Sequence, residues 1–176
     1  MNTPTKITLS RIIFIPIVIT LFLLEMWIAA ATFFLLLSLT DFLDGYIARK
    51  TNACTPTGAF LDPIADKVLV ISAMFLIVTL DTDYKIMLTI LFLLCVARDQ
   101  IVSGFRLVGE SKKVTIKVDK LGKAKTVLLN IALIVLFLAP LNPILALSGF
   151  IIAFAGTILS LTSGANYILQ NKKVLQ

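Results

Sequence analysis

The chain has 176 residues, of which 59% are hydrophobic, and a formal net charge of +6 at pH 7. A soluble domain of this length is much less apolar, so the composition predicts an integral membrane protein with a single domain over residues 1–176. The absence of histidine excludes histidine acid–base catalysis and histidine-ligated zinc. Cys54 and Cys95 fit no metal or redox spacing and are interpreted as free thiols.

Six apolar stretches follow one another along the chain, at roughly 7–24, 28–48, 58–80, 85–108, 121–139 and 143–168. Each is near the ~20 residues that a helix needs to cross a bilayer. The first stretch lacks a small-residue cleavage site, so we expect it to remain as a helix. The sequence therefore predicts an all-α membrane protein, a bundle of six transmembrane helices with short loops.

Polar or helix-breaking residues separate these stretches. Glu25 separates the first stretch from the second, and residues 50–56 separate the second from the third. Asp81 and Asp83 separate the third from the fourth, and residues 140–143 the fifth from the sixth. The longest polar segment is 109–125. Within it, residues 114–118 alternate as in a short strand, but a solvated loop fits equally well, and residues 109–120 are a candidate lid.

The charges predict how the chain sits in the membrane. Six spans place both termini and the loops at 49–57 and 109–120 on one side, and among the 16 Lys and Arg residues only Lys85 falls in the opposite loops. The positive-inside rule makes the basic side cytoplasmic. We therefore expect a multi-pass protein of the bacterial cell membrane, with the lipid bilayer rather than nucleic acid as the partner of its net charge.

Four aspartates stand out in this apolar chain: Asp41, Asp44, Asp62 and Asp66. Spacings of three and four residues place each pair on one helix face, and the two helices are neighbours because their connection is short. Carboxylates buried near a bilayer need compensation, and intramembrane acids are usually functional. Hard oxygen donors suit two divalent cations, Mg²⁺ or Mn²⁺. Helix caps and ion pairs with Arg49 and Lys67 are the structural alternative.

The segment from 41 to 66 resembles the signature of the CDP-alcohol phosphatidyltransferase family, D-x2-D-G-x2-A-R-x8-G-x3-D-x3-D. Every defining position is filled. The resemblance implies a metal site of Asp41, Asp44, Asp62 and Asp66, with Asp66 also as the catalytic base that removes the proton of the attacking alcohol. It also implies a CDP-diacylglycerol site, made by Thr5, Asp44, Gly45, Ala48, Arg49, Thr55 and Gly58.

Some of these roles also have a physical reason. Gly45 and Gly58 let a ligand approach a helix closely, and Ala48 keeps the same face open one turn below Gly45. Small-residue packing between helices is the alternative for these three positions. Arg49 is either a diphosphate ligand or an interfacial anchor, and Thr55 is a possible donor to the nucleotide.

Three further segments resemble the bacterial phosphatidylglycerophosphate synthases of this family: residues 2–11 with the following IIFIPI, residues 98–106 and residues 120–126. Asp99 stands where glutamate is expected. The resemblance weakens in the final helix. It implies transfer of the phosphatidyl group from CDP-diacylglycerol to sn-glycerol 3-phosphate by metal-assisted in-line attack, with release of CMP, and it suggests a homodimer.

The acceptor is a dianion and needs cations other than the metals. Arg98 and Arg106 are eight residues apart, near two helical turns, so they share a face. Together with Lys123 and Lys125 they are the candidate phosphate ligands. Cations that snorkel to the interface are the alternative interpretation of these residues.

Other functions stay open at this point. The same chemistry could use inositol phosphate, serine or phosphatidylglycerol as acceptor. A divalent-cation transporter is also conceivable, but its site should lie near the midplane of the membrane. Asp41 is instead ~21 Å along a helix from Trp27, close to the cytoplasmic surface. A structural membrane subunit would not need the carboxylates.

Overall fold

The computed structural model describes residues 3–51, 56–112 and 121–171, and all the regular secondary structure within these residues is helical. Side-chain surroundings are described for residues 13–40, 64, 65, 67–109, 111, 112, 122 and 124–171. The helices are α1 (Thr3–Leu23), α2 (Trp27–Thr51), α3 (Pro56–Ile77), α4 (Lys85–Ser111), α5 (Leu121–Phe137), the short 3₁₀ helix η1 (Ala139–Leu141) and α6 (Pro143–Gln170).

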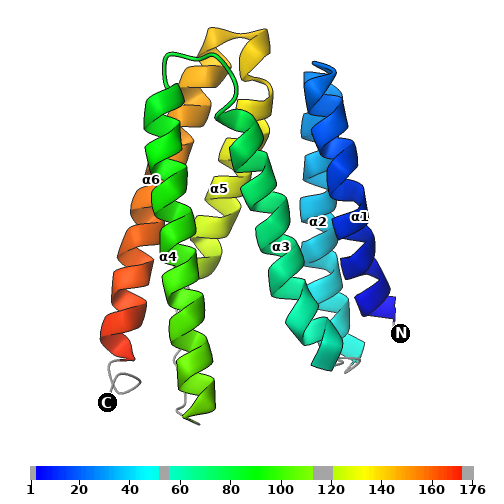
Figure 1. Cartoon of the computed structure of the whole chain (residues 1–176), viewed down its shortest axis with the longest axis vertical. Helices are drawn as coiled ribbons and strands as arrows, with labels where there is room; N and C mark the ends of the chain where they lie inside the picture. Colours follow the sequence, from blue (N-terminus) through cyan, green and yellow to red (C-terminus); the bar gives the residue numbers. More distant parts are fainter. Residues whose placement is uncertain (1–2, 52–55, 113–120, 172–176) are drawn as a thin grey trace.

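Each of the six predicted apolar stretches forms a helix, so the all-α prediction is confirmed. The helices run alternately up and down, with both ends of the chain at the same end of the bundle (Figure 1). We call this the terminal end and the other the loop end. The possible strand at 114–118 lies outside the described residues, and so does most of the candidate lid.

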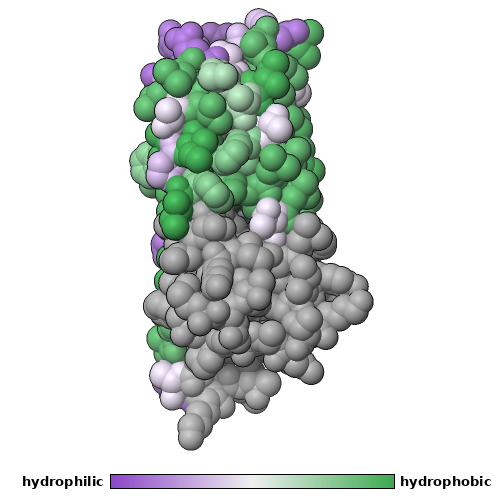
Figure 2. Space-filling view, turned by 90° about the vertical axis from the view of Figure 1, so that its right-hand side faces the viewer, coloured by the Kyte–Doolittle hydropathy of each residue, from purple (hydrophilic) through white to green (hydrophobic). Residues whose placement is uncertain are grey.

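The described residues contain three stretches long and apolar enough to cross a membrane: Lys85–Gly109, Ala124–Leu141 and Pro143–Gln170. Shorter apolar stretches lie in the first three helices, at Ile13–Leu23, Trp27–Thr40 and Lys67–Ile77. Figure 2 shows hydrophilic side chains gathered at the loop end, above a largely hydrophobic described surface. The described residues therefore have the apolar helices of a membrane protein, and that all six helices cross the membrane stays a prediction.

The helices at the loop end begin and end within three residues of the predicted positions. Glu25 closes the turn after α1 in a left-handed conformation, with φ of 58°. Asn142 caps α6 by accepting a hydrogen bond from the backbone N–H of Ile144 at 2.9 Å, and Pro143 occupies the first turn. Proline fits that position because its missing N–H would have no partner within the helix.

α5 joins two groups of helices. α1 packs against α2 and α3, α6 packs against α4 and α5, and α5 also contacts α2 and α3. Towards the loop end the core is aromatic. The centre of the Phe137 ring in α5 lies 5.5 Å from the centre of the Phe22 ring and 5.4 Å from that of the Phe34 ring. All three side chains are buried.

A row of small residues lets α6 approach its neighbours closely. Ala146, Gly149, Ala153, Gly156 and Ser160 are buried along one side of the helix. A Cβ atom on Gly149 would come within 2.7 Å of the Leu136 side chain in α5. Such close contacts are how membrane helices gain packing energy without a hydrophobic driving force.

Candidate functional site

The aspartate motif occupies two successive helices. Asp41 and Asp44 lie in α2, and Asp62 and Asp66 lie in α3. Residues 52–55 connect these helices, so the end of α2 and the start of α3 are at most ~19 Å apart. Both lie at the terminal end of the bundle, as predicted (Figure 1). The side chains of the four aspartates lie outside the described set, and their roles stay predictions.

The predicted nucleotide-lipid ligands fall in the same part of the fold. The motif residues Gly45, Ala48 and Arg49 belong to α2, and Gly58 to α3. Thr5 belongs to α1, which packs against both α2 and α3. Thr55 lies outside the described residues. The backbone thus brings every described member of this set to the terminal end of three adjoining helices.

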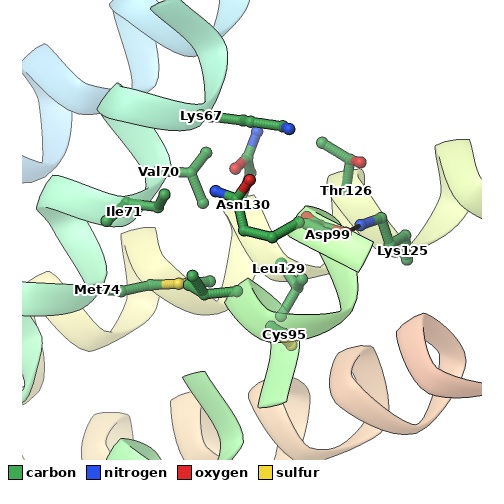
Figure 3. Close-up of a pocket in the computed structure, with 12 residues that line it drawn as sticks. Lys67, Val70, Ile71, Met74, Cys95, Asp99, Lys125, Thr126, Leu129 and Asn130 are labelled. Atoms are coloured by element: carbon green, nitrogen blue, oxygen red, sulfur yellow. Dashed lines mark hydrogen bonds and ion pairs between the residues drawn. The ribbon is translucent and has the colours of Figure 1, made fainter. Parts of the chain in front are cut away.

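A pocket with both polar and apolar lining residues opens next to the motif, between α3, α4 and α5. Its volume is about 50 Å³, enough for about three to five water-sized groups. Figure 3 shows Lys67 extending from α3 at one side of the pocket, with Asp99 of α4 and Thr126 and Asn130 of α5 across from it. Val70, Ile71, Met74 and Leu129 form its apolar wall.

Lys67 ties this pocket to the motif, because it directly follows Asp66 in α3. Its Nζ donates a hydrogen bond to the Oγ of Ser103 in α4 at 2.5 Å. The Ser103 hydroxyl in turn donates to the backbone carbonyl of Asp99 at 2.7 Å. The pocket therefore begins one residue away from the predicted catalytic base.

Asp99 lies between two cations. Its Oδ1 accepts a hydrogen bond from Arg98 Nη1 at 2.8 Å and another from Lys125 Nζ of α5. The residue Lys125 is buried and lines the pocket. Burial of a cation is costly unless it has a partner, and the Asp99 carboxylate supplies a hydrogen-bonded partner to both cations. The three residues form a fixed charged group, which we call the Asp99 cluster.

The pocket and the Asp99 cluster together carry an excess of positive charge. Three cationic side chains (Lys67, Arg98 and Lys125) accompany one carboxylate among the described residues there. That excess of two charges matches a phosphate monoester, which carries about −1.5 to −2 at neutral pH. The described side chains are thus suited to a small phosphorylated ligand.

The four predicted acceptor ligands are not equally placed. Lys125 lines the pocket, whereas Arg98 contacts it through Asp99. Arg106 is exposed and is not among the lining residues; its guanidinium carbon lies 6.0 Å from the centre of the Tyr167 ring. Lys123 lies in α5, with its side chain outside the described set. The role of each residue in binding stays a prediction.

Sequence reasoning missed Lys67 and Ser103 as site residues. It considered Lys67 only as an ion-pair partner of the aspartates. Its position directly after Asp66 could have suggested a place beside the reaction centre. Ser103 offered no such signal, because a single serine in an apolar helix commonly bonds to its own backbone.

Residues 1–161 match the CDP-alcohol phosphatidyltransferase family. The match includes the whole aspartate motif, α1 to α5 and most of α6. The chain therefore belongs to this family.

Several bacterial relatives share most of their length with this chain. It is 36% identical to a protein of Rickettsia felis, over 98% of this chain and 96% of the relative. It is 38% identical to one of Rickettsia typhi (94% of each chain) and 36% identical to one of Escherichia coli K12 (95% of this chain and 93% of the relative). All three relatives bear the name CDP-diacylglycerol–glycerol-3-phosphate 3-phosphatidyltransferase.

Proposed function

We propose that the protein transfers the phosphatidyl group of CDP-diacylglycerol to sn-glycerol 3-phosphate, which gives phosphatidylglycerophosphate and CMP. The family membership and the names of the relatives support this reaction. The observation that carries the choice of acceptor is the cationic pocket beside Asp66. Serine and other acceptors without a phosphate would not need its excess positive charge.

The proposed acceptor site places the phosphate between Lys67 and Lys125. Lysine supplies a compact charge with three donors, which suits a small phosphate. The uncharged lining side chains of Thr126 and Asn130 supply donors and acceptors for the glycerol hydroxyls. With its phosphate held there, the acceptor would lie beside the part of α3 that carries Asp66, the residue before Lys67.

The proposed reaction is a single displacement at phosphorus. The acceptor hydroxyl attacks the phosphorus that carries diacylglycerol, its proton passes to Asp66, and the bond from that phosphorus to the CMP oxygen breaks. A well-placed base contributes typically 10²–10⁴-fold to such a step. The polar side chains that line the pocket would orient the acceptor for this attack.

The donor set fits two divalent cations, because it consists of four carboxylates on two consecutive helices that meet at the terminal end. Asp41, Asp44, Asp62 and Asp66 would hold them. Such cations supply charge neutralisation for the diphosphate and the leaving CMP. Thr5, Gly45, Ala48, Arg49, Thr55 and Gly58 would complete the CDP-diacylglycerol site.

We extend the proposal to topology and assembly. Six spans with the terminal end in the cytoplasm follow from the charge distribution. The large apolar side chains of Ile86, Leu93 and Ile101 are exposed on α4 and need lipid or another protein surface. A homodimer is consistent with such a surface and with the family resemblance. Cross-linking in the native membrane tests the assembly.

One assay tests the reaction. Purified protein in mixed micelles receives CDP-diacylglycerol with glycerol 3-phosphate, glycerol, serine, inositol phosphate or phosphatidylglycerol, and CMP release is measured. We expect release with glycerol 3-phosphate and much less with the others. Equal rates with glycerol and glycerol 3-phosphate would contradict the phosphate pocket, and release with serine alone would identify a different transferase of the same family.

A further inference from the structure

Arg98 is held on several sides by protein groups. Its side chain is only 11% exposed. Nη1 donates to Asp99 at 2.8 Å, and Nη2 donates to the Oγ of Ser163 in α6 at 3.1 Å. Nε is buried and forms no hydrogen bond with the described residues. The guanidinium therefore bridges α4 and α6 beside the pocket, but Arg98 itself is not one of the lining residues.

Gly164 makes the space for this arrangement. A Cβ atom at position 164 would lie 2.7 Å from Arg98 Nε, 2.9 Å from its Cγ and 3.3 Å from its Cδ. These atoms are in the middle of the side chain, and the guanidinium beyond them is bound at both Nη atoms. Arg98 could thus not avoid an alanine at 164 without weakening a hydrogen bond to Asp99 or Ser163.

We propose that Ser163 and Gly164 are positioning residues for the acceptor site, acting through Arg98 and Asp99 on Lys125. Ser163 accepts a hydrogen bond from the guanidinium, and the absence of a side chain at Gly164 lets Arg98 pack closely against α6. Arg98 then holds the Asp99 carboxylate, which holds the Lys125 ammonium at the pocket wall. This inference rests on the proposed function for the role of Lys125 in binding glycerol 3-phosphate.

The two residues lie outside the part of the chain that matches the family, which ends at residue 161. They are also distant in sequence from the aspartate motif at residues 41–66. Two other small residues of α6 pack against apolar side chains: Gly149 faces Leu136, and Gly156 faces Leu129. Gly164 instead faces a charged side chain that belongs to a hydrogen-bonded series. A change at Gly164 should consequently alter ligand binding, beyond its effect on helix packing.

The first experiment compares three glycine-to-alanine variants by steady-state kinetics. Gly164→Ala should raise the KM for glycerol 3-phosphate about three- to tenfold, the size expected from weakening one charged hydrogen bond. The KM for CDP-diacylglycerol should stay within twofold, and kcat should change less than the KM for the acceptor. Gly149→Ala is the matched control, because its Cβ would also meet a neighbour at 2.7 Å, but that neighbour is Leu136. Gly104→Ala has open space around its Cβ.

Neither control should raise the KM for glycerol 3-phosphate, although Gly149→Ala should reduce the yield of folded protein. If all three variants gave the same KM as the unchanged protein, the positioning role of Gly164 would be wrong. A rise with Gly149→Ala equal to that with Gly164→Ala would show that loosened packing is the cause, and would equally overturn the proposal.

The second experiment is a double-mutant cycle with Lys125→Ala. Because Gly164 is proposed to act through Lys125, Gly164→Ala should have little further effect on the acceptor KM once Lys125 is absent. An equal fold-change in both backgrounds would contradict the series of contacts. If Lys125→Ala alone left the acceptor KM unchanged, the proposed phosphate site would be wrong. That result refutes the proposed function, whereas equal fold-changes in the cycle refute only the positioning role of Gly164.

A third experiment uses variants of Ser163, so it tests the proposal even if the Gly164→Ala variant does not fold. Ser163→Ala removes the acceptor of the Arg98 Nη2 hydrogen bond and should raise the acceptor KM about two- to fivefold. Ser163→Thr keeps the hydroxyl and should restore most of the affinity. Equal KM values for the unchanged protein and Ser163→Ala would remove Ser163 from the set, and a threonine variant as weak as alanine would do the same.

Discussion

The two ends of the bundle are built by different physical rules. Towards the loop end, Phe22, Phe34 and Phe137 meet as buried rings with no polar partner to satisfy. At the terminal end, Arg98, Asp99 and Lys125 are fixed by directed hydrogen bonds. Apolar packing tolerates changes of shape that conserve volume, whereas a buried charged group requires each partner in place. Stability should therefore depend on the first region and substrate affinity on the second.

Removal of divalent cations should have the largest effect on the terminal end. Four clustered carboxylates without cations repel one another and bind a diphosphate poorly. EDTA should abolish CMP release, and excess Mg²⁺ or Mn²⁺ should restore it, while thermal unfolding of the loop-end core should change much less. Full activity in chelator would contradict the metal site.

Substitution of the predicted base should come next. Asp66→Asn is nearly isosteric but cannot accept the proton of the acceptor, so kcat should fall by about 10²–10⁴-fold. Binding of CDP-diacylglycerol should be largely spared. Asp41→Asn and Asp62→Asn are the matched variants and should weaken binding of both metal and nucleotide lipid. Near-normal turnover by Asp66→Asn would mean that the base lies elsewhere.

Truncation in the aromatic core should separate stability from affinity. Phe137→Ala removes a fully buried ring and should cost about 3–5 kcal/mol of unfolding free energy. The KM values for both substrates should stay unchanged in the protein that remains folded. Thermal unfolding in detergent and steady-state kinetics measure the two quantities. A marked rise in either KM would show that the two regions are coupled more strongly than their separation suggests.

Loss of a pocket lysine should show the opposite pattern. Lys125→Ala removes a charged hydrogen bond worth ~1.5–3 kcal/mol to a bound phosphate, so the KM for glycerol 3-phosphate should rise about ten- to a hundredfold. Affinity for CDP-diacylglycerol should change much less. The ratio of the rate with glycerol 3-phosphate to the rate with unphosphorylated glycerol should also fall. Equal weakening of both substrates would place Lys125 in a general structural role.

Arg106→Ala should have the smallest effect of the series. The residue is exposed, does not line the pocket and contacts the Tyr167 ring. Loss of the exposed cation–π contact should cost about 0.5–1 kcal/mol of unfolding free energy. The acceptor KM should change much less than with Lys125→Ala, as steady-state kinetics would measure. If Arg106→Ala matched Lys125→Ala in raising the acceptor KM, the phosphate site would extend further along α4 than the described pocket.

The sequence by itself determined the helices and the end of the bundle that carries the aspartate motif. Apolar stretches near twenty residues long can satisfy their backbone groups in lipid only as helices, so each predicted stretch forms one. The breaks at Glu25, Asp81 and Asn142 were visible because charged and capping residues interrupt the apolar pattern. The aspartate motif was visible because fixed spacing within two consecutive helices is a local property of the chain.

The tertiary structure alone decided which cations share a carboxylate. Arg98 and Asp99 are adjacent in α4, so their contact is local, whereas Lys125 reaches the same carboxylate from α5, 26 residues along the chain. Lys67, Ser103 and Ser163 come from three helices, and their hydrogen bonds depend on how closely those helices pack. That approach is set by side-chain volumes across an interface, such as the missing Cβ of Gly164 against Arg98. Contacts between helices distant in the chain are not encoded by periodicity or spacing, and so they emerge only when the bundle is assembled.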